Sequence, residues 1–177
     1  NAPISATNGD TEAQIEGIPG DVAFGKFGGT NATDNSGVIK YVSVRFGGAL
    51  IGDGNEINGI TLGGVGSGTV VENIEIVANK DDGLEIFGGT VNVKNVIVAY
   101  QDDDAIDFDF NYSGTVDNFY VIMGGGTTDE GLEIDGPEGT TYVDGLFTLK
   151  NGSIIATDQL VTSGADFKDA AQGTVQN

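Results

Sequence analysis

The sequence predicts an all-β protein that winds as a parallel β-solenoid, and three observations lead to this fold class. The chain has 30 glycines and three prolines among 177 residues, and short runs rich in Val, Ile and Phe are separated by turn residues. This composition favours many strands and tight turns over helices. In addition, one strand motif recurs at steps of 22 to 26 residues, and a second motif carries charges that alternate in sign from copy to copy.

The first strand motif has apolar residues at its second and fourth positions. Its copies are residues 59–62, 83–86, 105–108 and 131–134. The steps between their first residues are 24, 22 and 26 residues, which is the length of one solenoid coil.

The second strand motif recurs at the same pace, at residues 39–44, 71–76, 93–98 and 116–121. Apolar residues alternate with polar ones in each copy, as a half-buried strand requires. Stacking these copies in register predicts two inward columns: Val42, Ile74, Val96 and Phe119, and Val44, Ile76, Val98 and Val121.

The other positions of the second motif test this register. In the predicted stack, opposite charges alternate along an outward column, which is favourable between neighbouring strands. The column consists of Lys40, Glu72, Lys94 and Asp117. Asn73, Asn95 and Asn118 form a further column at one corner, where Asn tolerates unusual backbone angles.

The length favours one domain over residues 1–177, with residues 1–20 and 150–177 as terminal caps or extensions. Only residues 165–172 have a weak helical pattern. A solenoid leaves open strand edges at its end coils, and these edges must be capped or paired with another copy.

The composition also limits the partners. Twenty-seven acidic residues face seven basic ones, for a net charge of −20, so nucleic acid and anionic membrane surfaces would be repelled. Cys and His are absent, which excludes thiol, imidazole and ordinary zinc chemistry. With no span-length apolar run and no signal-peptide pattern, we expect a mature secreted or cell-surface product without membrane insertion.

Four phrases of the sequence resemble a known family. They are "TDNSGVIKYVSVRF", "GNEINGITLGGVGSGTV", "DDGLEIFGGTVNVKN" and "DDDAIDFDFNYSG", which together extend from about residue 33 to 135. The chain is similar here to acidic, largely uncharacterised repeat proteins of the surfaces and secretomes of Bacteroidetes-type bacteria. The resemblance implies a right-handed parallel β-helix, here of about six coils of 22 to 27 residues, located outside the cell.

The same register stacks carboxylates. Asp82, Asp104 and Glu130 precede the first strand motif in successive copies, and Glu85, Asp107 and Glu133 point outward from it. Like charges about 5 Å apart repel, and only Lys80 lies beside them in sequence. Calcium accepts six to eight oxygen ligands in irregular geometry. We therefore predict calcium as a cofactor, held by Asp81, Asp82, Asp103, Asp104, Asp107, Asp129 and Glu130.

Two alternatives remain open for these carboxylates. One is a solvated acidic face without a ligand. The other is a polysaccharide-binding or polysaccharide-degrading enzyme that uses aspartates of adjacent coils as acid and base, with Asp82, Asp103, Asp104 and Asp107 as candidates. With one arginine, Arg45, the chain is poorly suited to hold an acidic polymer.

The sequence thus predicts a non-enzymatic, calcium-stabilised structural or adhesive module, secreted or on the cell surface. Its expected partners are a glycan or another cell-surface component, and other copies of the chain through the end coils. Stacking of end coils would produce a fibre.

Overall fold

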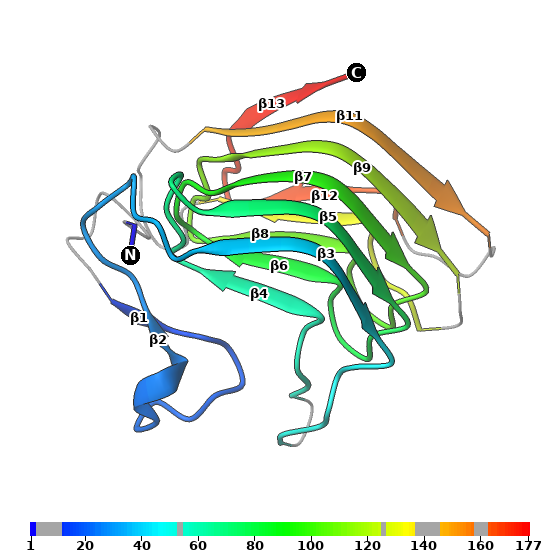
Figure 1. The fold of residues 1–177 in the computed structure, drawn as a ribbon. Helices are drawn as coiled ribbons and strands as arrows, with labels where there is room; N and C mark the ends of the chain where they lie inside the picture. The colour runs from blue at the N-terminus through cyan, green and yellow to red at the C-terminus, as the bar shows by residue number, and fades with distance from the viewer. Residues whose placement is uncertain (3–11, 53–54, 125–126, 137–145, 158–162) are drawn as a thin grey trace.

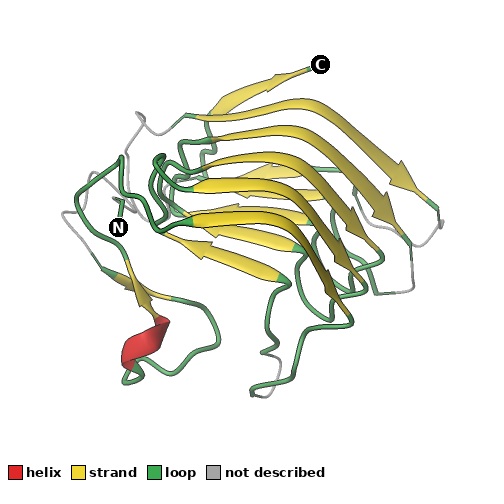
Figure 2. Cartoon of the chain, in the orientation of Figure 1, coloured by secondary structure: helices red, strands yellow, loops and turns green. Residues whose placement is uncertain are grey.

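The protein is a parallel β-helix in the computed structural model, which describes residues 1–2, 12–52, 55–124, 127–136, 146–157 and 163–177 (Figure 1). Two parallel sheets form its walls, and turns and loops connect them at both sides (Figure 2). The predicted fold class is confirmed.

The six-stranded sheet contains the second strand motif. In spatial order its strands are β3 (Val38–Arg45), β5 (Val70–Val77), β7 (Asn92–Ala99), β9 (Thr115–Met123), β11 (Phe147–Ala156) and β13 (Gly173–Gln176). The five-stranded sheet contains the first motif in β4 (Ile60–Gly63), β6 (Leu84–Phe87), β8 (Ile106–Asp109) and β10 (Leu132–Asp135), and β12 (Asp166–Lys168) is its fifth strand. From β3 to β13, successive strands along the chain belong to the two sheets in turn. Each full coil therefore contributes one strand to each sheet.

The predicted register is confirmed by the pairing of the strands. Glu72 on β5 pairs with Lys40 on β3 and with Lys94 on β7, and Asp117 on β9 follows Lys94. Lys150 of β11 extends this column. The column, here called the charge ladder, contains ion pairs from Lys40 Nζ to Glu72 at 3.0 Å and from Lys150 Nζ to Asp117 at 3.4 Å.

The core lies between the two sheets and contains the predicted apolar columns. Val42 is the exception: it lies on the edge strand β3 and is 37% exposed. Side chains of the first strand motif, such as Ile86 and Phe108, pack in the core with Ile74, Val96 and other residues of the second motif. Tyr112 closes part of the core, since its ring meets that of Phe108 edge to face at 4.6 Å and its hydroxyl donates to the Val91 carbonyl at 2.7 Å.

The six-stranded sheet bends at the asparagine column. Asn73, Asn95 and Asn118 have positive φ angles of 57°, 57° and 63°, a backbone region that asparagine tolerates better than most residues. The amide of each later coil donates to the amide oxygen of the coil before it, at 2.7 Å in both cases. The predicted corner therefore exists, and its side chains are hydrogen-bonded along the helix axis.

The structure differs from the sequence-based expectation near the C-terminus. The weak helical pattern at 165–172 is wrong, because β12 occupies part of it and pairs with β10. Phe167 of β12 stacks on Phe147 with a 6.2 Å separation of ring centroids, and this pairing and packing override a weak local propensity. Strands β12 and β13 continue both sheets within residues 150–177.

Residues 12–28, here called the N-terminal segment, precede the solenoid. They include β1 (Ala13–Gln14), the short 3-10 helix η1 (Ala23–Gly25) and β2 (Lys26–Phe27), and β1 pairs antiparallel with β2. Phe27 packs against Phe87 and Phe110, with ring centroids 5.5 and 5.8 Å away. The N-terminal segment therefore lies against the outer face of the five-stranded sheet.

Candidate functional site

The stacked carboxylates come from two positions of the first strand motif. The strand column consists of Glu85 on β6, Asp107 on β8 and Glu133 on β10, which are paired in register. The turn column lies just before these strands and consists of Asp82, Asp104 and Glu130. Its members are linked, because Asp82 accepts a hydrogen bond from the Asp104 amide at 3.0 Å and Asp104 accepts one from the Glu130 amide at 2.6 Å.

These carboxylates face away from the core, yet several of them are buried. Only 3% of Glu85 and 5% of Asp107 is exposed, and Asp82 and Asp104 are also buried. The N-terminal segment and the loop before β4 cover them and enclose an acidic cavity of about 250 Å³. Its lining consists of Glu16, Gly17, Asn55, Glu56, Asn58, Asp81, Asp82, Glu85, Asp103, Asp104, Asp107 and Glu133.

Hydrogen bonds satisfy only some of the polar atoms that line this cavity. The side-chain amide of Asn58 donates to one oxygen of Glu85, and the turn column is bonded to backbone amides as described. In contrast, Oδ1 of Asp107 and Oδ1 of Asn58 are buried without a hydrogen-bond partner among the described residues. Burying an oxygen without a partner costs free energy. Both atoms are therefore available to coordinate a cation.

The environment disfavours the charged form of the carboxyl groups. Burial, followed by the nearby Asp103 carboxylate, raises the pKa of Asp81 to about 6. Burial also raises the pKa of Asp104 to about 8 and that of Glu85 to about 10. For Asp107, burial and the adjacent Asp109 carboxylate place the pKa well above its usual value. Without a cation, the buried carboxyl groups that have no basic partner are neutralised by binding protons.

Basic residues pair with carboxylates only at the rim of this region. Lys80, the single basic neighbour in sequence, pairs with Asp102 at 3.2 Å. Lys168 of β12 pairs with Glu133 at 2.6 Å, and this hydrogen bond raises the pKa of the lysine. Neither lysine is among the residues that line the cavity.

Four groups of carboxylates have oxygens within 4.8 Å of one another among the described residues. They are Asp81, Asp82 and Asp103; Asp82, Glu85 and Asp107; Asp104, Glu130 and Glu133; and Glu16, Glu85 and Asp109. Six of the seven predicted metal ligands belong to these groups. Asp129, whose side chain is exposed, belongs to none of them.

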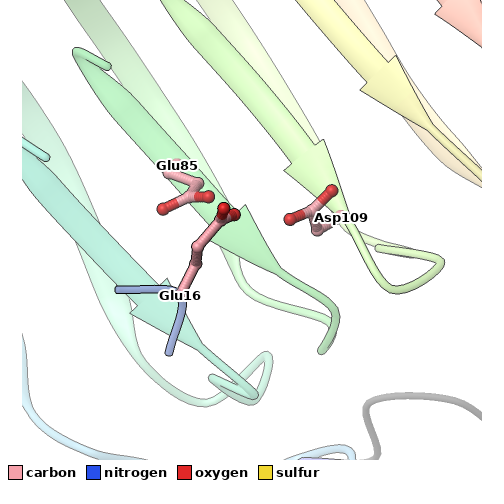
Figure 3. A group of neighbouring side chains, drawn as sticks. All are labelled: Glu16, Glu85 and Asp109. Atoms are coloured by element: carbon pink, nitrogen blue, oxygen red, sulfur yellow. The ribbon is translucent and has the colours of Figure 1, made fainter. Parts of the chain in front are cut away.

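The structure adds four carboxylates that the predicted ligand set lacks. Glu85 and Glu133 were recognisable as outward members of the strand column, and Asp109 follows at the next outward position of β8. Glu16 had no such signal, since it lies in the N-terminal segment, outside the repeats. Figure 3 shows its side chain extending toward Glu85 and Asp109, which lie on neighbouring strands.

The fold and this cavity define a parallel β-helix repeat protein with buried carboxylates on the outer face of one sheet. The chain belongs to the family described as the pectate-lyase-like β-helix domain, whose sequence model matches residues 4–177. Neither the curated proteins nor the solved structures gave a match. Within the described residues, no helix has the length and apolar character that a membrane span requires.

Proposed function

We propose that this chain is a calcium-stabilised β-helix module that acts outside the cell as a structural or adhesive element. The observation that carries the proposal is the buried Oδ1 of Asp107, which has no hydrogen-bond partner in the described part of the chain although its carboxylate lies against those of Asp82 and Glu85. A divalent cation bound by this group would neutralise three buried acids and supply the missing partner.

Calcium suits the cavity better than other common cations. Its oxygen ligands lie 2.3 to 2.6 Å from the ion, so ligand atoms on opposite sides are about 5 Å apart. Oxygens of Asp82, Glu85 and Asp107 lie within this reach of one another. The unsatisfied Oδ1 of Asn58 lines the same cavity and supplies a neutral ligand. Magnesium requires a more regular octahedron and shorter distances.

Thermal unfolding with calcium or with a chelator tests the proposal. Ligand that binds the folded state alone raises the melting temperature, so we expect a higher midpoint in millimolar calcium than in chelator at pH 7.5, and a smaller gain with magnesium. Asp107→Asn should remove most of the calcium effect, whereas the matched change Asp117→Asn in the charge ladder should retain it. Equal midpoints with calcium and with chelator would refute the calcium role.

The end coils support a structural role. Strand β3 has one hydrogen-bonded neighbour, β5, in the described part of the chain, and Tyr41 and Phe46 beside this edge are 83% and 80% exposed. At the opposite end, β13 pairs only with β11 in that part, and Val175 is exposed. We propose that these edges associate end to end with other copies. Filaments in negative-stain images are the expected result, and monodisperse particles at all concentrations would contradict it.

A polysaccharide-degrading enzyme is the second candidate, and the family membership favours it. Of the candidate aspartates, Asp104 suits the general acid, because burial raises its pKa to about 8 and keeps its carboxyl group protonated near neutral pH. A neutral glycan suits this acidic cavity better than a polyuronate. Sugar release from a panel of neutral glycans, abolished by Asp104→Asn, would establish this activity in place of a non-enzymatic role.

A further inference from the structure

The outer face of the six-stranded sheet is hollowed at the asparagine column by a groove of about 390 Å³, here called the amide groove. The groove crosses β5, β7 and β9, and its lining includes the three asparagines of the column. The outward residue two positions further along each strand also lines it, and these residues are Glu75, Ile97 and Tyr120. Because they pair in register, the groove extends along the axis of the solenoid.

Two side chains of the amide groove present an apolar surface to the solvent. Ile97 is 43% exposed and Tyr120 is 40% exposed, whereas Val96 and Val98 on either side of Ile97 are buried. Ile97 and Tyr120 are also neighbours in the strand register. A partly exposed tyrosine has an apolar ring face on which a ligand can pack, and a hydroxyl group that can form a hydrogen bond at its edge.

The amides beside this surface retain hydrogen-bonding capacity. A side-chain amide has two N–H donors and a carbonyl oxygen with two lone pairs, and the column uses one donor each of Asn95 and Asn118. On the next coil, Asn151 donates to Asp117 instead of to Asn118, so the series of amide bonds ends at Asn118. The bonds along the column hold the amides in place, which lowers the entropy cost of binding a ligand there.

The charged groups around the amide groove pair with one another. Glu75 accepts hydrogen bonds from Ser43 Oγ at 2.7 Å and from Arg45 Nη2 at 2.5 Å. On the other side of the asparagine column, the charge ladder alternates lysines with acids and contains two ion pairs. The groove therefore offers hydrogen bonds and apolar surface rather than a net charge.

A neutral sugar chain fits these properties better than other classes of ligand. The net charge of −20 disfavours an anionic ligand. An extended peptide that adds to a sheet needs an open strand edge, whereas β5, β7 and β9 have a paired strand on both sides. A sugar ring has an apolar face for Tyr120 and Ile97, and its hydroxyl groups both donate and accept hydrogen bonds, as the amides do.

We propose that the amide groove binds a neutral glycan chain that lies along the axis of the solenoid. Neighbouring strands are about 4.8 Å apart, close to the length of one sugar unit in an extended chain, so successive units meet successive coils. Tyr120 packs on a sugar ring, and the amides of Asn95 and Asn118 bond to hydroxyl groups. The inference rests on the proposed adhesive function and names its ligand class, and the groove lies on the other sheet from the calcium site.

Titration of the full chain with neutral oligosaccharides, followed by NMR of the side-chain amides, tests this inference. The probes are linear oligomers of glucose, of mannose and of xylose, with oligogalacturonate as the anionic comparison. We expect at least one neutral oligomer to shift the side-chain amide signals of Asn95 and Asn118, and oligogalacturonate to leave them unchanged. These signals locate the site in the wild-type chain, so this result does not depend on the folding of a variant.

Substitution of the exposed tyrosines gives the matched comparison. Tyr120→Ala should weaken binding at least about tenfold, because it removes a ring that packs on the ligand, whereas Tyr120→Phe should retain most of the affinity. Tyr100→Ala is the control, since Tyr100 is 49% exposed but lies outside the amide groove, and it should bind as the wild type does.

The outcomes separate this inference from the proposed calcium role and from the enzyme alternative. Binding that Tyr120→Ala weakens and Tyr100→Ala retains would support it, whether or not calcium changes the melting temperature. No binding of any of the three neutral oligomers would overturn it and leave the calcium role standing. Shifts of the Asn58 amide in place of the groove amides would put the sugar in the acidic cavity and overturn it. Shifts of the groove amides with protein concentration alone would indicate a second copy of the chain there, which would also overturn it.

Discussion

The two outer faces of the solenoid stack charged residues by the same geometry but compensate them differently. On the six-stranded sheet, the charge ladder alternates lysines with acids, and its members pair with one another in water. On the five-stranded sheet, the strand column places Glu85 beside Asp107 and covers both with other parts of the chain. Repetition alone therefore does not decide stability. A stack of alternating charges is complete in itself, whereas a buried stack of like charges requires protons or a cation.

The largest expected effect is a pH dependence of the metal-free protein. In the folded chain burial raises the pKa of Asp104 to about 8 and that of Glu85 to about 10, whereas both are near 4 when unfolded. The folded state thus binds more protons between these values, so stability falls as pH rises. In chelator we expect the melting temperature to decrease by about 10 °C between pH 5 and pH 9.

Calcium should flatten this dependence, because the bound ion replaces the protons. The charge ladder, whose Asp117 has a lowered pKa from its bonds to Asn151 and Lys150, should not produce a decrease in this range. Differential scanning calorimetry in both buffers gives the comparison. A metal-free protein that is equally stable at pH 5 and pH 9 would contradict the burial of ionisable groups described here.

The next effect is the change in stability caused by Asp107→Asn, which should have opposite signs without and with calcium. Asp107→Asn removes a buried acid from the strand column, so in chelator at pH 8 we expect it to stabilise the protein by about 2 kcal/mol. In calcium it should destabilise, because a ligand is lost. Urea unfolding in both buffers measures this, with Asp117→Asn as the control on the other face. Destabilisation by Asp107→Asn in both buffers would indicate that the carboxylate acts through packing or hydrogen bonds alone.

The asparagine corner of the six-stranded sheet should show an intermediate effect. Asn95→Ala removes two amide hydrogen bonds and places a less tolerant residue at a φ of 57°, so we expect a loss of about 2 kcal/mol. Asn95→Gly loses the same bonds but accepts the backbone angle, so it should cost less. Chemical unfolding of both variants tests this, and a larger loss for glycine would contradict the role given to the backbone.

The smallest effect belongs to the charge ladder. Glu72→Lys would place three positive charges side by side with Lys40 and Lys94. The groups are partly exposed, so we expect a loss of only about 0.5 to 1 kcal/mol that diminishes in 1 M salt. Stability curves at low and high salt measure it. A loss of several kcal/mol would show that like charges repel on this exposed face about as strongly as on the buried face of the five-stranded sheet.

Periodicity made much of this molecule predictable. The register of both strand motifs, the asparagine corner and the two carboxylate columns follow from residues that recur at coil spacing, such as Glu85 and Asp107. The cover over the carboxylates was not predictable, because the N-terminal segment has no repeat and its contact between Glu16 and Glu85 joins residues far apart in sequence. Consequently, the sequence left a solvated acidic face open as an alternative to the buried cavity, and the predicted ligand set included Asp129 but not Glu85.

The asparagine column has a consequence for how such a protein can change in length. Asn95 donates to Asn73 on the preceding coil and accepts from Asn118 on the following one, so both steps of the column have the same direction. Duplication of a whole coil, such as residues 92–114, would insert one more amide that fits both neighbours. Insertion of half a coil would interrupt the series of hydrogen bonds between the asparagine amides. Growth by duplication is therefore restricted to whole coils, and each added coil would lengthen both outer columns together.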